Sequence, residues 1–311
     1  MNQPHPDQTP DGPAYQGRLL PRPGEEVVDQ GLGFDVGTLL SRRRMLRVFG
    51  LGAGMAALAA CGVEASSGSE STASTAGGLT EIPDETAGPY PGDGSNGPDV
   101  LEQAGIVRRD IRSSFGTGSA TAEGVGLEFE LTVLDLAGDG APFAGVAVYA
   151  WHCDADGRYS MYTEGLENEN YLRGVQIAND QGTVRFTSIF PACYPGRWPH
   201  IHFEVYPDQA AITDSANAIA TSQMALPKDV ADAVYATAGY PQSVTNLASL
   251  TLESDNVFGD DGAEHQLGTV TGSVADGYLA RLTVPVDTTT EPTGGSATGG
   301  RPGGEPPRPP R

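Results

Sequence analysis

Between residues 127 and 286, short apolar stretches are separated by turn-forming residues, and this pattern constrains the fold more than any other feature. Residues 127–134 alternate apolar and polar side chains, as a half-buried strand does. Residues 145–151 are continuously apolar and aromatic, which is typical of a buried strand. Pro227 begins the one stretch, residues 227–236, that has a helical pattern. Further strands are predicted at residues 183–190, 199–206, 266–274 and 278–286. The pattern predicts an all-β fold, a two-sheet β-sandwich with one short helix.

His200 and His202 lie within the strand predicted at residues 199–206. Because successive side chains of a strand point to opposite faces, both imidazoles face one side and Ile201 faces the other. Neutral imidazole is the commonest metal ligand in proteins. The chain contains five histidines, so two at this spacing indicate a metal site. A pair of ordinary core or surface histidines is the alternative.

Two tyrosines accompany this pair. Tyr194 precedes His200 by six residues, across a Pro-Gly turn that can fold its ring back toward the strand. Tyr159 follows an earlier apolar stretch. The pKa of a phenol is about 10 in water, but a bound cation can remove the proton and make tyrosinate a hard anionic ligand. Tyrosinate together with imidazole suits ferric iron better than zinc or magnesium.

Three motifs, WHCDADGRYS at 151–160, YPGR at 194–197 and HIHF at 200–203, occur in that order. Together they resemble the intradiol ring-cleavage dioxygenases, the catechol and protocatechuate type enzymes with mononuclear non-heme Fe(III). The resemblance covers roughly residues 86–226. It implies that Tyr159 is an equatorial tyrosinate and that Tyr194 is an axial tyrosinate that leaves the metal when substrate binds. His200 and His202 would complete the ligand set.

The same resemblance assigns two further residues and an activity. Arg197 would stabilise carbanion character on the substrate ring, and Gln223 looks like the glutamine that lies beside the ligands in the family. The implied reaction is cleavage of a catechol between its two hydroxylated carbons by O2, which gives a cis,cis-muconate-type product and serves aromatic compound catabolism. The implied partners are a small aromatic diol and O2. Tyr90 matches no ligand position of the family, and no motif specifies which catechol is used.

Two other classes of function remain open at this stage. The first is an exported binding module that captures a catechol or a metal without turnover. The second is a zinc enzyme built on His200, His202 and a carboxylate such as Glu204 or Asp208. Glu204 shares the strand face of His202, but this second interpretation leaves both tyrosines unexplained.

The two ends of the chain differ in composition from the predicted domain at residues 81–286. Residues 1–40 lack a periodic pattern and are predicted to be disordered. Residues 41–61 combine arginines, a short apolar stretch and small residues, as a twin-arginine signal peptide with a lipobox does, with Cys61 lipidated. Ordinary secretion with an incidental Cys61 is the alternative. Residues 62–80 are predicted to form a flexible linker, and residues 287–311 a disordered Pro- and Gly-rich tail.

Cys153 and Cys193 remain once Cys61 is assigned to the lipid anchor. An exported protein meets an oxidising environment, in which the two could pair and join the two tyrosine segments. We predict this disulfide, and two buried free thiols are the alternative that the sequence leaves open.

The formal net charge is −22 at pH 7. Residues 1–60 hold six Arg and six Asp or Glu, so the remainder of the chain carries all of the excess. Such a charge argues against nucleic acid and anionic lipid as partners and favours a neutral catechol over a carboxylated one. The predicted contact with a membrane is therefore only the lipid on Cys61, at the cell surface, or none if the protein is released. The residues leave the oligomeric state open.

Overall fold

The computed structural model describes residues 7–9, 12–15, 18–19, 75–76 and 78–295, which fall into two compact units, residues 1–69 and 70–311. In the first unit, three short strands pair in an antiparallel sheet inside the extension predicted to be disordered. The predicted signal peptide with Cys61, and most of the predicted linker, lie outside the described residues. The three strands are β1 (Asp7–Thr9), β2 (Gly12–Tyr15) and β3 (Arg18–Leu19).

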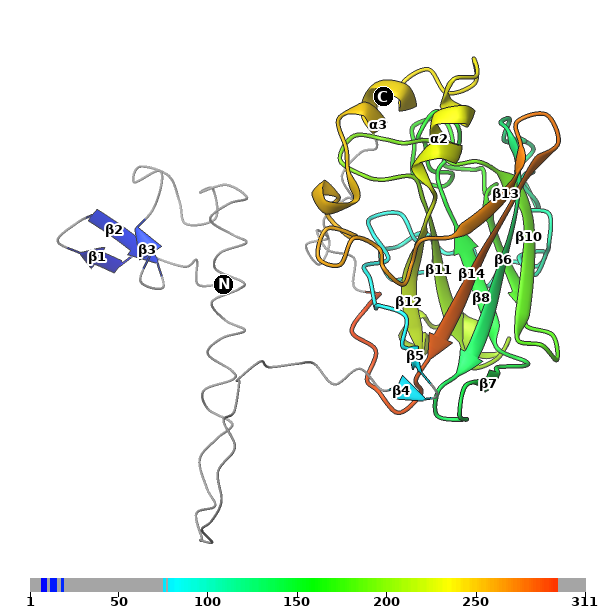
Figure 1. Ribbon diagram of the computed structural model, residues 1–311, viewed down its shortest axis with the longest axis horizontal. Coiled ribbons are helices and arrows are strands. Elements are labelled where there is room, and N and C mark those ends of the chain that lie inside the picture. Colours follow the sequence, from blue (N-terminus) through cyan, green and yellow to red (C-terminus); the bar gives the residue numbers. More distant parts are fainter. Residues whose placement is uncertain (1–6, 10–11, 16–17, 20–74, 77, 296–311) are drawn as a thin grey trace, which may run out of the picture. The chain divides into compact units, whose positions relative to one another are not determined.

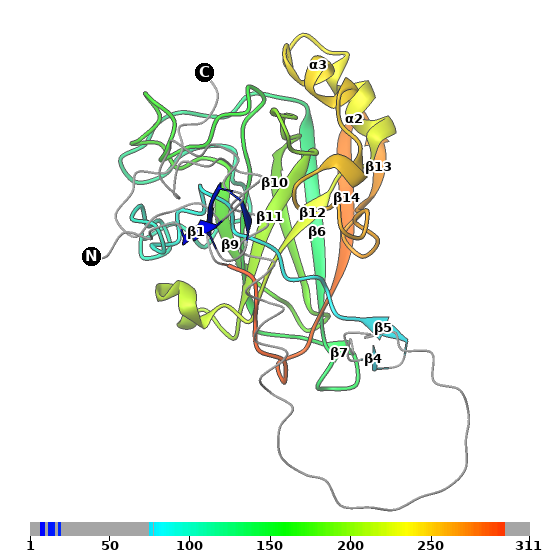
Figure 2. The same ribbon diagram turned by 90° about the vertical axis from the view of Figure 1, so that its left-hand side faces the viewer.

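The second unit contains two main sheets that face each other (Figures 1 and 2), so the predicted all-β sandwich is confirmed. One sheet has the strand order β10-β6-β14-β13, with β7 paired to β6, and the other has the order β12-β11-β8-β9. The first consists of β6 (Gly126–Asp135), β7 (Ala141–Pro142), β10 (Thr183–Ile189), β13 (Thr269–Ser273) and β14 (Gly277–Val286). The second consists of β8 (Ala147–Trp151), β9 (Arg173–Ile177), β11 (His200–Tyr206) and β12 (Ala220–Ala225).

The first sheet has one buried face. In β6, Leu127, Phe129, Leu131 and Val133 are buried, whereas the residues between them are partly exposed. Alternation of this kind is what the sequence shows, because one face packs on the core and the other meets solvent. The neighbouring strand β14 runs parallel to β6, although the two are joined by most of the domain.

The second sheet is covered on both faces, and this places the site. All seven residues of β11 are buried. Ile201, Phe203 and Val205 belong to the hydrophobic core, so the period of two directs His200 and His202 to the outer face of the sheet. Loops from several parts of the chain cover that outer face.

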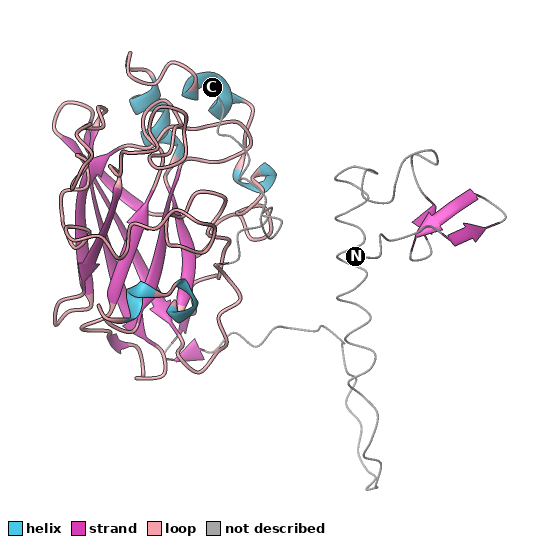
Figure 3. Cartoon of the chain, turned by 180° about the vertical axis from the view of Figure 1, so that it is seen from behind, coloured by secondary structure: helices cyan, strands magenta, loops and turns pink. Residues whose placement is uncertain are grey.

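Two helices in the described part of the chain, α2 (Lys228–Tyr235) and α3 (Ser243–Ala248), lie at one end of the sandwich (Figure 3). The first begins after Pro227 as predicted, and the second was not predicted. The hairpin of β4 (Thr75–Ala76) and β5 (Leu79–Thr80) lies at the opposite end (Figure 1). Among the described residues, no helix has the length and apolar character needed to span a bilayer. The described residues also contain three 3₁₀ helices, η2 (Ala211–Thr213), η3 (Ser215–Asn217) and η4 (Leu252–Ser254).

The beginning of the predicted tail packs against the start of the domain. Thr293 donates a backbone hydrogen bond to Asp84 at 2.6 Å. Gly295 donates another to the carbonyl of Glu85 at 3.0 Å. The packed domain therefore extends beyond the predicted boundary at residue 286 and reaches at least residue 295.

The predicted disulfide is wrong. Cys153 and Cys193 are both buried and unpaired. The Cys153 thiol donates to the carbonyl of Ala192 at 3.6 Å, and the Cys193 thiol donates to that of Arg197 at 3.4 Å. Each sulfur is thus directed at a carbonyl of the same loop and not at the other sulfur.

Candidate metal centre

Four side chains from three segments bring their donor atoms together on the outer face of the second sheet. His200 and His202 come from β11, Tyr194 from the loop before it, and Tyr159 from the loop after β8. The two imidazole Nε2 atoms are 3.0 Å apart. Tyr194 Oη lies 3.2 Å from His200 Nε2 and 3.3 Å from Tyr159 Oη. The structure therefore brings together all four residues that the sequence predicted as ligands.

This spacing fits a single metal ion. Nitrogen and oxygen ligands lie roughly 2.0–2.2 Å from a metal such as zinc, so neighbouring donors around one ion are separated by roughly 3 Å. Two phenols and two imidazoles provide up to two negative charges once the phenols ionise, which suits a hard, highly charged cation better than a soft one. The residues present thus fit the metal that the family resemblance implies.

The histidines are oriented by different means. His200 Nδ1 donates to the carbonyl of Trp198 at 2.5 Å, so the lone pair of the neutral ring lies on Nε2, toward the other donors. His202 Nδ1 has no hydrogen-bond partner in the described part of the chain. Instead, its ring stacks on Trp151 at 4.9 Å with an interplanar angle of 6°. Burial lowers the pKa of His200 to about 3 and that of His202 well below its ordinary value, so both rings are neutral near pH 7.

The tyrosines differ from each other in exposure. Tyr159 is 2% exposed, whereas Tyr194 is half-buried. Burial raises the pKa of Tyr194 to about 12 and that of Tyr159 well above 10. Both phenols therefore keep their protons in the chain alone, and only a bound cation would make them anionic ligands at neutral pH.

Two glycines let the covering loops approach the site. Gly88 has φ +72°, and a Cβ there would lie 3.4 Å from Cε1 of His202. Gly157 has φ +82°, and its Cβ would lie 3.3 Å from Cβ of Tyr194. Both positions need the left-handed backbone that glycine adopts without strain.

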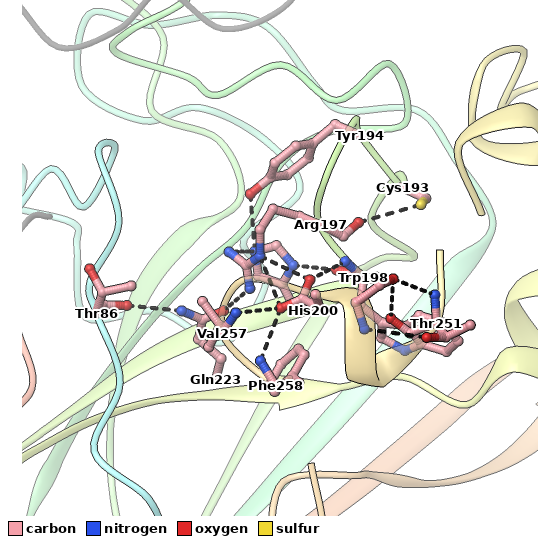
Figure 4. Close-up of polar contacts among 12 residues, drawn as sticks. Thr86, Cys193, Tyr194, Arg197, Trp198, His200, Gln223, Thr251, Val257 and Phe258 are labelled. Carbon is pink, nitrogen blue, oxygen red and sulfur yellow. Dashed lines mark hydrogen bonds and ion pairs between the residues drawn. The ribbon is translucent and has the colours of Figure 1, made fainter. Parts of the chain in front are cut away.

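Arg197 and Gln223 lie beside the donors, as predicted. Gln223 is opposite His202 in the ladder between β12 and β11. Its Oε1 accepts a hydrogen bond from Arg197 Nη2 at 2.6 Å, and its Nε2 donates to the carbonyl of Thr86 at 2.9 Å. Arg197 Nη1 lies 3.5 Å from His200 Nε2. Figure 4 shows Tyr194 on one side of His200, with Gln223 reaching from the other side to Thr86.

Sequence reasoning missed Asp255, whose side chain is fully buried against Arg197. The distance from Asp255 Oδ2 to Arg197 Nε is 3.1 Å, and these side chains are 0% and 12% exposed. Burial by itself would raise the pKa of the Asp255 carboxyl, but Arg197 and three backbone N–H groups outweigh it, so the pKa is lowered. Asp255 follows Arg197 by 58 residues and belongs to no motif, so the sequence offers no signal for this pair.

Arg173 is a second residue that the sequence analysis did not single out. It is 1% exposed, and it donates to the carbonyls of Tyr90 and Pro91 at 2.9 and 2.5 Å. It also donates to the carbonyl of Ser160, next to Tyr159, at 3.0 Å. Tyr90, which was not predicted as a ligand, packs on the ring of Tyr159 with centroids 4.9 Å apart. Arg173 therefore holds the loop that carries Tyr159 against the leading segment of the domain.

Neither carboxylate of the zinc alternative is placed to complete a site. Glu204 accepts a hydrogen bond from Tyr206 at 2.7 Å, and burial together with nearby Asp93 raises its pKa to about 8. Asp208 accepts backbone hydrogen bonds from Ala210 and Ala211. Within the described ranges, no group of three or more His, Cys, Asp or Glu side chains is arranged to hold a metal. The tyrosines are therefore required to complete the donor set.

A β-sandwich that gathers two phenols and two imidazoles around one point has the donor set of a single-ion metal centre. Comparison with known proteins agrees with this class. A family model described as "Dioxygenase" matches residues 96–214. The chain is 35% identical over 85 residues to a 6-chlorohydroxyquinol 1,2-dioxygenase from Cupriavidus pinatubonensis, covering 22% of this chain and 30% of that protein. It is 34% identical over 55 residues to a chlorocatechol 1,2-dioxygenase from Rhodococcus opacus, covering 18% of this chain and 21% of that protein.

A solved structure supports the fold. An intradiol ring-cleavage dioxygenase from Tetranychus urticae superposes with a TM-score of 0.53 at 22% identity, covering 69% of this chain and 98% of that one. The matches to the two curated relatives span only 30% and 21% of their lengths. Over part of its length, the chain is thus similar in sequence to ring-cleaving dioxygenases, and its fold is that of an intradiol ring-cleavage dioxygenase.

Proposed function

We propose that the protein is an Fe(III)-dependent intradiol dioxygenase that cleaves a catechol-type ring with O2 to a cis,cis-muconate-type product. The observation that carries this proposal is the convergence of Tyr159, Tyr194, His200 and His202, whose donor atoms are linked by separations of 3.0–3.3 Å. Ferric iron, when bound, would withdraw electron density from a chelated catecholate and make the ring reactive toward O2.

The four side chains would have two separate tasks in this reaction. The histidines and Tyr159 are fully buried and would hold the metal. Tyr194, the half-buried donor, belongs to a loop and is the ligand that an incoming diol can displace. Its Oη would then accept a proton from the diol, because burial raises the pKa of Tyr194 to about 12 and so makes its phenolate a strong base.

Arg197 and Gln223 would act on the substrate ring. The guanidinium of Arg197 lies beside His200 Nε2 and is held by Gln223. A fixed positive charge in a site that excludes water stabilises negative charge that develops on the ring as it reacts. Because both side chains are already in place, little reorganisation is needed when the reaction occurs.

The purified full-length protein tests the proposal directly. Its metal content and visible spectrum are measured first, and catechol is then added in an oxygen-electrode cell. We expect a red protein with about one iron per chain, as four protein ligands for one ion require, whose absorption band shifts on adding catechol while O2 is consumed. A coloured protein that shifts without consuming O2 across a panel of catechols would contradict turnover and indicate a binding module. A colourless protein containing zinc would contradict the iron assignment.

The sequence also supports a proposal for location. We propose export by the twin-arginine route and lipidation of Cys61, from the composition of residues 41–61. Expression of Cys61→Ser beside the original chain tests the anchor. We expect the original chain in the membrane fraction, with a lipid mass on its mature N-terminal peptide, and the variant in the soluble exported fraction. The same fractionation for both chains would contradict lipidation.

A further inference from the structure

We propose that Asp255 is a positioning residue that fixes the guanidinium of Arg197 beside the metal centre. This inference rests on the proposed function, because it assigns to Asp255 a part in the same reaction. It brings in the segment between α3 and β13, which contributes none of the motifs of the family resemblance.

The geometry of the pair orients the guanidinium. Arg197 Nε faces Asp255, with 3.1 and 3.3 Å to the two carboxylate oxygens. This contact occupies the Nε side of the guanidinium and leaves Nη1 and Nη2 on the side of the metal centre. Nη2 donates to Gln223 at 2.6 Å, and Nη1 lies 3.5 Å from His200 Nε2. One carboxylate therefore fixes which edge of the planar cation faces the reacting groups.

Asp255 is itself held by several hydrogen bonds. Its Oδ1 accepts hydrogen bonds from the backbone of Val257 at 2.8 Å and of Phe258 at 3.0 Å. Its Oδ2 also accepts the backbone N–H of Trp198 at 2.6 Å. Asp255 thus binds both the side chain of Arg197 and the backbone of the next residue, so the two segments are joined at adjacent positions.

Asp255 also balances the positive charge of Arg197. Arg197 is almost fully buried, and an unpaired buried cation is unfavourable. It is also close to a position where a metal cation would bind, and like charges repel each other. The negative charge of Asp255 offsets both effects. Without it, the arginine would retain the amide oxygen of Gln223 and the ring of Phe258, whose centroid is 5.8 Å away, but no carboxylate.

The test is a double-mutant cycle on the full-length, iron-loaded protein. Asp255→Asn keeps the shape of the side chain and removes its charge, and Arg197→Met removes the cation. We expect Asp255→Asn to lower kcat by about 10–100-fold, somewhat less than the loss of a preorganised donor. In the Arg197→Met background, the same substitution should change kcat by less than about 2-fold, because the group on which it acts is gone.

Readouts other than activity separate positioning from a merely structural role. Iron content and the visible band should match those of the original chain in Asp255→Asn. Affinity for 4-nitrocatechol, titrated under argon, should fall and show the same lack of additivity. Asp255→Glu, which restores the charge on a longer arm, should recover part of the loss. Asp261→Asn is the matched control, because Asp261 lies in the same segment and caps the Ala263 N–H at 2.7 Å, without a hydrogen bond to Arg197.

Two outcomes would overturn the inference. One is a pair of losses that multiply, which would show that Asp255 acts independently of Arg197. The other is loss of iron and of thermal stability in both Asp255 variants, which would make the residue a structural support. If the original chain consumes no O2, the proposed function fails instead, and the 4-nitrocatechol cycle still decides whether Asp255 positions Arg197.

Discussion

The candidate metal centre has two halves that are built differently. His200 and His202 lie on β11, which pairs with β12 on one side and β8 on the other. Tyr159 and Tyr194 lie on loops that cross the outer face of the same sheet. The backbone of the strand half is fixed by ladder hydrogen bonds on both sides, whereas the loop half depends on side chains such as Arg173 and on close contacts at Gly157.

This difference separates two requirements of the site. A strand paired on both edges holds its imidazoles at one spacing, so it defines where a metal binds. A loop ligand such as Tyr194 can move without breaking a sheet, so it is suited to exchange with a substrate. We expect substitution of either strand ligand, or of the fully buried Tyr159, to remove the metal. Substitution of the half-buried Tyr194 should change chemistry while the metal stays.

The largest effect is expected from His202→Ala. Losing one of the two strand ligands should lower iron affinity by more than about 100-fold. Even residues that only hydrogen-bond to a metal ligand contribute about 10–100-fold to metal affinity. Metal analysis and the visible spectrum measure this. His265→Ala is the control, because His265 is exposed. Full iron content in His202→Ala would break the proposed division between the halves.

Tyr194→Phe tests the loop half. We expect iron to remain, the visible band to shift, and kcat to fall by about 100-fold, because the group that takes the substrate proton is absent. Tyr240→Phe is the matched control, since its phenol donates to the carbonyl of Phe190 at 2.8 Å, away from the donors. Complete loss of iron from Tyr194→Phe would show that this loop ligand also holds the metal.

Metal removal should loosen the two halves unequally. After chelation, amides near Tyr159 and Tyr194 should exchange with solvent about 10-fold or more faster, because local opening is cheapest in loops. Amides of β11 should change little, since both edges of the strand remain paired. Hydrogen exchange followed by mass spectrometry compares the two, and equal acceleration in β11 would contradict the division.

A glycine pair isolates the contact behind Tyr194. Gly157 and Gly165 both have φ above +80°, but a Cβ at Gly165 would meet nothing within 4 Å. Substitution by Ala should cost about 1 kcal/mol of stability at either position. Only Gly157→Ala should also shift the visible band, by pressing on Tyr194. Thermal unfolding and absorption spectra measure the two effects. Identical spectra for the two variants would show that the close contact at Gly157 does not determine the position of Tyr194.

A further effect concerns pH. Burial, followed by repulsion from Asp260 and Asp261, raises the pKa of Glu85 from 4.5 to about 8, while Gln266 and Arg197 oppose the rise. The folded chain therefore binds this proton more tightly than the unfolded chain, and stability from this group falls as pH rises from about 4.5 to about 8. Chemical denaturation at several pH values measures the slope. Glu85→Gln should flatten it, and an unchanged slope would assign the dependence to other groups.

The sequence predicted most of the sandwich but missed β9 and β12. Residues 220–225 of β12 are all buried, so no alternation marks the strand, and its Ala, Ser and Gln residues favour no particular element. In β9, the buried Arg173 occupies a position where an apolar residue is expected. The structure tolerates this charge because backbone carbonyls accept its hydrogen bonds. Each strand lies at an edge of the sheet and pairs with one strand, β12 with β11 and β9 with β8.

The four candidate ligands could be identified because their spacing and motifs are local. Asp255 could not, since nothing near it distinguishes it from the many surface carboxylates of this acidic chain. The disulfide was wrong because proximity of two cysteines to the same site says nothing about where their thiols point. The contacts of Thr293 with Asp84 and of Gly295 with Glu85 likewise depend on tertiary packing alone.

The parallel pairing of β14 with β6 bears on how the protein is made. Arg281 on β14 bonds to Glu130 on β6, 151 positions earlier. A ribosome therefore releases β6 long before its neighbour exists, and the sheet cannot close until translation of the domain is nearly finished. Nascent chains stalled before residue 277 would therefore expose the unpaired edge of β6, a template on which another chain could pair.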